Sequence, residues 1–259
     1  MTNDADLWDP AQYEKFRLER TQPFCDLLAL VRPRPQLRIV DLGCGTGELT
    51  LQMHKQLEAH ETVGIDNSLK MLERSRGFQS AGLRFEPADI ATFASDETFD
   101  LIFSNAAVQW VDDHAGVLTR LATMLSEHGQ LAIQMPANDD HVTHEAARVI
   151  ARHAPFQTAL NGWQRSTRVL SPDGYSSILH RLGFSQQHVR LQVYPHVLAD
   201  REAVIDWVRG TLLTDYQKRL PSELWPQFLE AYRIELFESL PDVRPFFYPF
   251  KRILLWAMK

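Results

Sequence analysis

Short apolar runs alternate with amphipathic stretches along the first half of the chain. Five apolar runs predict β-strands: the first contains Ile39 and Val40, and the others lie at residues 62–66, 83–90, 99–105 and 129–134. Between them, residues 48–56 and 117–125 carry leucine or methionine every three to four positions, as an amphipathic helix does. This alternation is typical of a doubly wound α/β fold with a mostly parallel sheet.

The second half of the chain predicts two more strands and a large helical insertion. The strands are expected at residues 184–194 and 249–258, and residues 200–240 read as helical. We interpret most aromatic side chains of this helical part as core packing. Together with residues 136–170, it is predicted to roof the functional site. The chain, residues 1–259, is interpreted as one domain.

Three glycines directly after the first strand predict a ligand-binding turn. Gly43, Gly45 and Gly47 let the backbone turn sharply with no side chain projecting into a cleft, and the helix that follows points free N–H groups at the ligand. A dinucleotide fingerprint would place a third glycine at position 48, where this chain has Glu48. Because a glutamate there would repel a diphosphate, the pattern favours a phosphate-free ligand with a single carboxylate.

Two acidic residues follow the next two predicted strands. Asp66 ends the second strand, 19 residues beyond Gly47, where a carboxylate can accept both hydroxyls of a ribose. Asp89 closes the third. Each alone is more often a solvated loop residue, but their order after the glycine turn favours an adenosine-containing ligand.

Composition argues against nucleic acid, membranes and metal ions as binding partners. The net charge of −6 predicts no general attraction to nucleic acid or to an anionic membrane. Two cysteines, Cys25 and Cys44, cannot form a disulfide framework or a zinc site unaided, and no metal is expected. No apolar stretch approaches the roughly 20 residues that span a bilayer, so we expect a cytoplasmic enzyme.

The N-terminal segment, residues 1–32, predicts helices that cover the ligand. Asp9 and Pro10 form a good helix start, and Tyr13, Phe16, Arg17 and Arg20 then share one face. Tyr13 and Arg20 are the favoured ligand contacts, with a ring near a cation and a guanidinium on a carboxylate. The alternative, a surface helix packed on the sheet with solvated arginines, stays open.

The motifs carry a family resemblance. The segment Asp41-Leu-Gly-Cys-Gly-Thr-Gly47 resembles motif I of the class I S-adenosylmethionine-dependent methyltransferases. Trp8-Asp9-Pro10, Gly64-Ile65-Asp66-Asn67-Ser68, Gln134-Met135-Pro136 and Thr143-His144 extend the likeness to the bacterial trans-aconitate 2-methyltransferase family, over nearly the whole chain. The resemblance implies a seven-stranded Rossmann-like sheet with a helical lid and S-adenosylmethionine as cofactor. The cofactor-binding residues that it implies are Tyr13, Arg20, Asp41, Gly43, Cys44, Gly45, Asp66, Asn67, Asp89, Ile90, Asn105, Ala106 and Trp110.

The methyl acceptor is predicted to be a small anion. The fourth strand ends in Ser104-Asn105-Ala106, without the Asn/Asp-Pro-Pro-aromatic motif of methyltransferases that act on DNA bases. The resemblance implies a carboxylate acceptor such as trans-aconitate, which would give a monomethyl ester. No catalytic base is then required, and the residues predicted to position the acceptor are His144, Arg165 and Tyr248. Further candidates are Arg168, Arg252, His141, Tyr194 and Lys251.

Two departures from the family pattern leave the acceptor open. Ala137 replaces an aspartate, and residues 212–215 replace a segment that carries an arginine. The alternative function is a small-molecule O- or N-methyltransferase with another acceptor. A nicotinamide oxidoreductase and a catalytically silent S-adenosylmethionine-binding module are less favoured alternatives.

Overall fold

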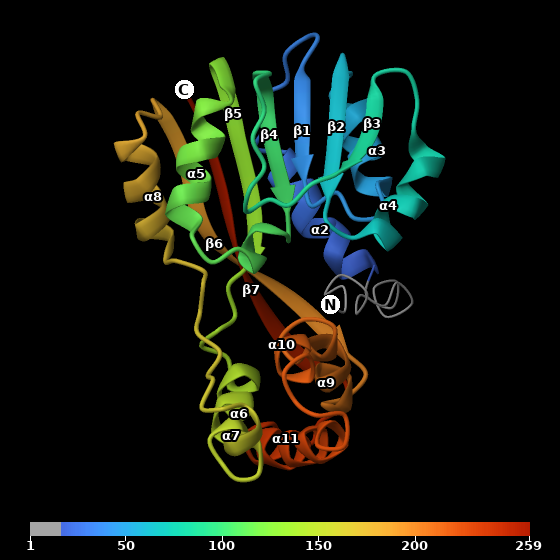
Figure 1. Cartoon of the computed structure of the whole chain (residues 1–259), viewed down its shortest axis with the longest axis vertical. Coiled ribbons are helices and arrows are strands. Elements are labelled where there is room, and N and C mark those ends of the chain that lie inside the picture. The colour runs from blue at the N-terminus through green and yellow to red at the C-terminus, as the bar shows by residue number, and fades with distance from the viewer. Residues whose placement is uncertain (1–16) are drawn as a thin grey trace.

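The computed structural model describes residues 17–259, and within them seven strands form one sheet (Figure 1). The strand order is β3-β2-β1-β4-β5-β7-β6, and β7 runs opposite to the other six strands. The strands are β1 (Arg38–Leu42), β2 (Glu61–Asp66), β3 (Leu83–Pro87), β4 (Phe99–Asn105), β5 (Leu125–Pro136), β6 (Gln186–Leu198) and β7 (Phe246–Met258). The predicted mostly parallel, seven-stranded Rossmann-like sheet is confirmed.

The centre of the sheet is apolar on both faces. Ile39, Val40 and Leu42 of β1 are each at most 1 % exposed, as expected for a parallel strand covered by helices on both sides. Because β1 lies between β2 and β4, the strand order reverses at the end of β1, the place where open α/β sheets bind ligands. The carboxyl ends of these strands therefore position the site.

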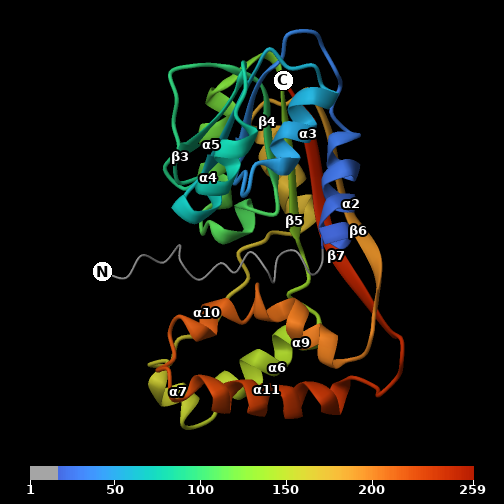
Figure 2. The ribbon, with the colours of Figure 1, turned by 90° about the vertical axis from the view of Figure 1, so that its right-hand side faces the viewer.

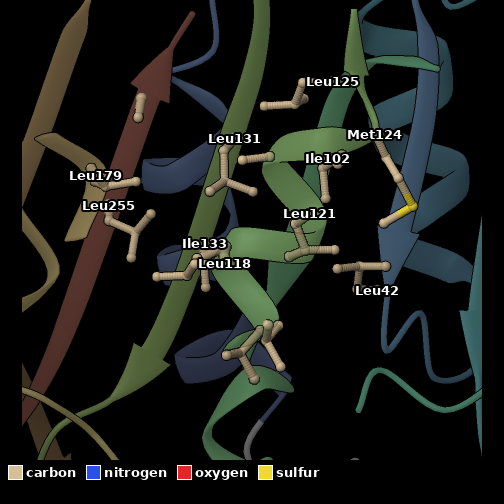
Figure 3. Packing of buried hydrophobic residues seen from close by; sticks show 14 of the residues in the cluster. Leu42, Ile102, Leu118, Leu121, Met124, Leu125, Leu131, Ile133, Leu179 and Leu255 are labelled. Carbon is tan, nitrogen blue, oxygen red and sulfur yellow. The ribbon is translucent and has the colours of Figure 1, made fainter. Parts of the chain in front are cut away.

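Helices cover the two faces of the sheet. On one face lie α2 (Arg17–Leu28) and α3 (Glu48–Gln56), where Phe24 meets Phe103 of β4 edge-to-face at 5.4 Å between ring centroids. α4 (Leu69–Ser75) lies beside α3, where Ser75 approaches Gly47, and the other face is covered by α5 (His114–Thr123) and α8 (Pro172–Arg181). Figure 3 shows Leu118 and Leu121 of α5 packed against leucines and isoleucines of β4 and β5. Burial of these side chains is the main force that holds the layers together.

A second helical group lies beyond the carboxyl ends of the strands (Figures 1 and 2). This helical layer comprises α6 (Val142–Ala151), α7 (Phe156–Ala159), α9 (Glu202–Arg209), α10 (Thr214–Gln217) and α11 (Trp225–Ser239). Trp207, Phe228 and Tyr232 are buried in its own apolar core, which agrees with the interpretation of these aromatics as core packing. The long antiparallel strands β6 and β7 extend from the sheet to this layer.

The boundaries differ from the predicted ones in two informative places. The fifth strand begins at Leu125, earlier than predicted, because the register between β4 and β5 shifts between Phe99 and Leu101 and restores pairing at Leu125. The third strand ends at Pro87, so Asp89 lies in the following loop. No helix of residues 17–259 combines the length and the apolar character needed to cross a bilayer.

Candidate functional site

A cavity of about 450 Å³ lies at the carboxyl ends of the strands. Its wall on the sheet side comes from the loops after β1, β2, β3 and β4, and its opposite wall comes from the segment around Arg168 and from residues 214–219 of the helical layer. Nine of the thirteen predicted cofactor-binding residues line it: Gly43, Gly45, Asp66, Asn67, Asp89, Ile90, Asn105, Ala106 and Trp110.

The glycine loop, residues 43–47, forms the floor of the cavity by bringing the backbone close to neighbouring strands. Gly43 has φ +78°, and a Cβ there would come within 2.2 Å of the Cβ of Ala107, so only glycine fits. Gly45 also has a positive φ, but a Cβ there would meet no atom within 4 Å, so the space above it is open. The loop thus joins β1 to α3 and leaves room for a ligand against its backbone.

Asp66 is held rigidly beside this loop. Its carboxylate accepts hydrogen bonds from Gly45 N at 2.9 Å and from Ser68 N at 2.8 Å, one on each oxygen. Burial raises the pKa of Asp66, while these backbone donors lower it. Because each oxygen keeps a free lone pair, the carboxylate can also accept two hydroxyl groups from a ligand.

The part of the sheet-side wall formed by the loop after β3 combines one acidic residue with apolar side chains. Asp89, in the loop after β3, accepts a hydrogen bond from Ala91 N at 2.8 Å. Ile90 and Met71 line the cavity near it and offer apolar contacts for the faces of an aromatic ring.

The end of β4 supplies the wall next to the glycine loop. Ala106 has φ +56°, a conformation that costs a non-glycine residue energy and is found mostly where the surroundings fix it. Its N–H donates to Gln134 O at 2.9 Å, which holds the turn in place. Asn105 and Trp110 line the cavity on either side of this turn.

Two predicted cofactor residues lie behind the cavity wall. The carboxylate of Asp41 is 5 % exposed and accepts a hydrogen bond from Thr50 Oγ1 at 2.6 Å. Burial raises its pKa to about 7, against the opposing effect of the Thr50 hydrogen bond and with a further rise from the charge of Asp66. Cys44 is buried, and burial raises the pKa of its thiol well above the usual range. Neither side chain is among those that line the cavity.

The remaining two predicted cofactor residues cannot be placed. Tyr13 lies outside the described residues, and the side chain of Arg20 is also outside them. Their predicted contacts stay predictions.

Three cations line the opposite wall, which we call the cation wall: Arg168, Lys218 and Arg219. Two of them, Arg168 and Arg219, are grouped with Arg165 around the buried carboxylate of Asp215. Arg165 Nε approaches an oxygen of Asp215 at 3.1 Å, Arg168 at 3.9 Å and Arg219 at 3.7 Å. One carboxylate therefore contacts three guanidinium groups, and Arg168 forms a further ion pair with Asp112, which also lines the cavity.

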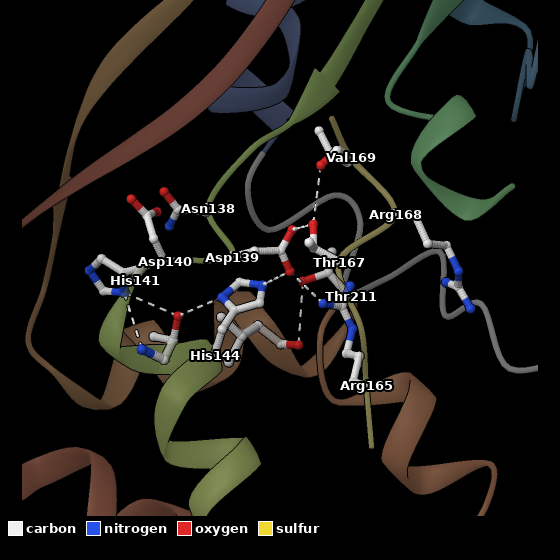
Figure 4. A network of polar contacts seen from close by, with 12 residues as sticks. Asn138, Asp139, Asp140, His141, His144, Arg165, Thr167, Arg168, Val169 and Thr211 are labelled. Atoms are coloured by element: carbon white, nitrogen blue, oxygen red, sulfur yellow. Dashed lines mark hydrogen bonds and ion pairs between the residues drawn. The ribbon is translucent and has the colours of Figure 1, made fainter. Parts of the chain in front are cut away.

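The three predicted positioning residues lie in or next to the helical layer: His144 on α6, Arg165 on the segment between α7 and α8, and Tyr248 on β7. Figure 4 shows His144 and Arg165 around Asp139: Arg165 donates to Asp139 at 2.6 Å, and His144 Nε2 lies 3.7 Å from the same oxygen. Burial lowers the pKa of His144 to about 3, the charge of Asp139 raises it and that of Arg165 lowers it further, so the imidazole is neutral at physiological pH. Neither residue lines the cavity.

Tyr248 and Arg252 are also buried outside the cavity lining. Asn138 Nδ2 donates to the hydroxyl of Tyr248 at 3.4 Å, and burial raises the pKa of this phenol. Arg252 is 4 % exposed in β7 and contacts the rings of Phe250 and Tyr194. Of the cationic candidates whose side chains the structure describes, only Arg168 lines the cavity.

Sequence reasoning missed Lys218, Arg219 and Met71. A local signal existed for Arg219, because it lies four residues after Asp215 in a helical stretch, the spacing of an ion pair on one helix face. No three His, Cys, Asp or Glu side chains within residues 17–259 are arranged to hold a metal ion.

Comparisons with known proteins agree with this geometry. Residues 33–179 match the family model described as a methyltransferase domain. A trans-aconitate 2-methyltransferase of Deinococcus radiodurans is 39 % identical over 97 % of this chain and 98 % of its own length. The enzyme of the same name from Streptomyces coelicolor is 37 % identical over 100 % of this chain and 89 % of its own length.

Solved structures show the same fold. The YcgJ protein of Bacillus subtilis has a TM-score of 0.60 at 16 % identity and covers 92 % of this chain and 98 % of its own. An S-adenosylmethionine-dependent methyltransferase from Mesorhizobium loti has a TM-score of 0.52 at 22 % identity, covering 91 % of this chain and 96 % of its own.

Proposed function

Because this chain belongs to the trans-aconitate 2-methyltransferase family, we propose that it transfers a methyl group from S-adenosylmethionine to a carboxylate of a small di- or tricarboxylic acid such as trans-aconitate. The product is a monomethyl ester. The observation that carries this proposal is the division of one cavity: among the described residues, its sheet-side wall holds the glycine loop and no cation, and its facing wall holds three cations.

The sheet-side wall fits S-adenosylmethionine. The open space above Gly45 and the free lone pairs of Asp66 suit an adenosine ribose, and Met71 and Ile90 suit the adenine faces. Asp66 and Asp89 would repel a phosphate placed beside them, so this wall favours a ribose without a 2′-phosphate. When bound, S-adenosylmethionine supplies a methyl group on a sulfonium centre.

The cation wall fits the carboxylates that do not react. A guanidinium binds a carboxylate with two parallel hydrogen bonds, and Arg168 and Arg219 both line the cavity. Asp215 keeps the guanidinium groups together and offsets part of their mutual repulsion. Two or three carboxylates on one small molecule would thus find cations at one end of the cavity while one carboxylate faces the methyl donor.

The reaction needs positioning and no base. A carboxylic acid with a pKa near 4 is ionised at pH 7, so its oxygen attacks the methyl carbon directly, the carbon–sulfur bond breaks and its electron pair stays on sulfur. The catalytic contribution is to hold oxygen, methyl and sulfur in line at roughly 3 Å. In this proposal the acceptor is not contacted by His144, Arg165 or Tyr248. These residues stabilise the helical layer that carries the cation wall.

The helical layer is proposed to act as the lid. Residues 136–170 and 200–240 contribute Arg168, Lys218 and Arg219 to the cavity, so they both bind the acceptor and exclude water from it. The segment of residues 1–32 is proposed to cover the cofactor.

Methyl transfer to a panel of acceptors tests the function. Purified protein is incubated with S-adenosylmethionine and with mono-, di- and tricarboxylic acids, a small alcohol and a small amine, and the products are identified by mass spectrometry. We expect a monomethyl ester from di- or tricarboxylates only. Methylation of the alcohol or amine alone would establish the alternative acceptor class, and cofactor binding without any product would indicate a silent binding module.

A further inference from the structure

Gln134 lies in a buried position that the proposed mechanism leaves unexplained. It is fully buried in β5, directly beside Asn105 of β4 in the sheet register, and Arg252 of β7 is its diagonal neighbour. It belongs to the Gln134-Met135-Pro136 motif. Its side chain thus connects a buried cation with a residue that lines the cavity.

The orientation of the Gln134 amide is determined by its neighbours. Its oxygen accepts hydrogen bonds from a guanidinium nitrogen of Arg252 at 3.0 Å and from Met135 N at 3.1 Å. Its nitrogen donates to Asn105 Oδ1 at 2.7 Å. The reverse orientation would set the amide nitrogen against two donors and the amide oxygen against an acceptor, so the hydrogen-bond network selects one orientation.

Arg252 determines the orientation of the other groups in this network, because it can only donate hydrogen bonds. A guanidinium has five N–H donors and no acceptor and stays protonated, so the oxygen of Gln134 must face it. Arg252 is 4 % exposed, and its guanidinium lies 4.9 Å from the ring centroid of Phe250. Burial and this ring contact restrict its movement. The direction of donation therefore runs from Arg252 to Gln134 and on to Asn105.

The orientation of Gln134 determines which atom of the Asn105 amide is available to a ligand in the cavity. Asn105 lines the cavity, and because its Oδ1 accepts from the buried Gln134, the amide nitrogen is the polar atom left to meet a ligand there. Its two N–H groups have no hydrogen-bond partner among the described residues. A carboxylate oxygen only accepts, so N–H groups at this position attract it and an amide oxygen would repel it.

We propose that Arg252 and Gln134 are positioning residues that make Asn105 present N–H groups, and not its oxygen, to the acceptor carboxylate. The inference rests on the proposed function for the identity of the acceptor. It assigns a role in acceptor selection to a residue on the sheet side of the cavity, opposite the cation wall. The role is one of hydrogen-bond direction and does not require Gln134 or Arg252 to touch the acceptor.

Gln134→Glu tests the direction of donation. A glutamate at this position accepts hydrogen bonds only, so it pairs with Arg252 and forces the Asn105 amide to turn, donating its N–H to Glu and facing its oxygen to the cavity. We expect kcat/KM for trans-aconitate to fall about tenfold, mainly through KM, because one attractive contact becomes repulsive. The Kd of S-adenosylmethionine stays within about twofold. Arg252→Lys keeps a cationic donor and is expected to retain most of the activity.

A double-mutant cycle separates amide orientation from simple charge. The new carboxylate of Gln134→Glu would repel an anionic acceptor through space whether or not Asn105 is present. In an Asn105→Ala background, an effect transmitted by the amide disappears, so Gln134→Glu should then change kcat/KM by less than about twofold. An equal loss in both backgrounds would overturn the inference.

Hydrogen exchange of the Asn105 side-chain amide tests the inference without any acceptor. In the parent protein this NH₂ group faces the cavity, so we expect fast exchange by NMR, and in Gln134→Glu it becomes buried and exchange slows at least tenfold. Slow exchange in the parent protein would overturn the inference even if methyl transfer occurs. Fast exchange in the parent and slow exchange in the variant, with no ester formed from any carboxylate, would uphold the amide orientation and refute the proposed function.

Discussion

The sheet-side wall and the cation wall of the cavity differ in how the chain builds them. The sheet-side wall comes from short segments at the ends of strands, and its contacts are made largely by backbone N–H groups, such as those of Gly45 and Ser68 on Asp66. The cation wall depends on ion pairs between side chains, such as Arg165 with Asp215 and Arg219 with Asp215. A change in backbone would therefore disturb the sheet-side wall, whereas substitution of a few side chains could change which ligand the cation wall binds.

This difference explains where the family resemblance is strong. The glycine loop and Asp66 match the common methyltransferase motifs, whereas the departures fall at Ala137 and residues 212–215. Leu212 and Leu213 are buried in the core of the helical layer, and Asp215 holds the guanidinium groups. The replaced segment, residues 212–215, therefore adds the carboxylate of Asp215. Lys218 and Arg219, a few residues further on, still place cations at the cavity.

The largest expected effect belongs to the sheet-side wall. Asp66→Ala removes the carboxylate that two backbone N–H groups hold and the proposed acceptor of the ribose hydroxyls. Because hydrogen bonds to a charged group contribute about 1.5–3 kcal/mol each, the Kd of S-adenosylmethionine should rise about 100-fold or more. Isothermal titration calorimetry measures it, with Asp96→Ala, an exposed acid outside the cavity lining, as control. Unchanged affinity in Asp66→Ala would show that this wall does not bind the cofactor.

The second effect is on the stability of the helical layer. Asp215→Asn leaves Arg165, Arg168 and Arg219 without their shared carboxylate, and removing one partner from a buried ion-pair cluster is destabilising. The free energy of unfolding should fall by about 2–3 kcal/mol in urea denaturation. Faster amide exchange is expected in residues 200–240 than in the sheet. Equal acceleration in both parts would indicate that the two walls do not respond independently.

The third effect is a pH dependence on the sheet side. Burial raises the pKa of Asp41 to about 7, so the folded cofactor-free protein binds a proton that the unfolded chain releases near pH 4. Stability from this group is thus fully present below pH 4 and is lost as the pH rises through 7. Relative to Asp41→Asn, which is neutral throughout, the free energy of unfolding should fall by about 2 kcal/mol between pH 5 and 8. A difference that stays flat over this range would refute the raised pKa.

The smallest effect concerns one contact of the cation wall. Arg219→Met removes a half-exposed guanidinium at the cavity, and KM for trans-aconitate should rise about tenfold while the Kd of S-adenosylmethionine stays within twofold. Arg209→Met removes an exposed arginine outside the cavity lining and serves as the matched control. Comparable KM values for the two variants would remove Arg219 from the acceptor site.

The sequence allowed the sheet and its wall of the cavity to be predicted because their signals are local. A buried strand runs directly into the glycine turn of Gly43 to Gly47, and Asp66 follows at the end of the next strand at a regular spacing of 19 residues. The mostly parallel seven-stranded order and nine of the predicted cofactor residues at one cavity follow from these signals.

The cation wall could not be predicted in the same way. Arg165 and Arg168 look alike in the sequence, yet Arg165 is turned toward Asp139 and Asp215 while Arg168 lines the cavity. Similarly, Arg252 reads as a candidate ligand for a carboxylate but is buried within β7. Packing between segments distant in sequence decides which cation faces a ligand. A local sequence pattern therefore does not predict it.

A crystal structure with S-adenosylhomocysteine and trans-aconitate bound together would test the division of the cavity most directly. The account predicts the ribose hydroxyls on Asp66, the non-reacting carboxylates on Arg168 and Arg219, and one carboxylate oxygen facing the sulfur. Trans-aconitate bound away from the cation wall, or a ribose that does not contact Asp66, would contradict it.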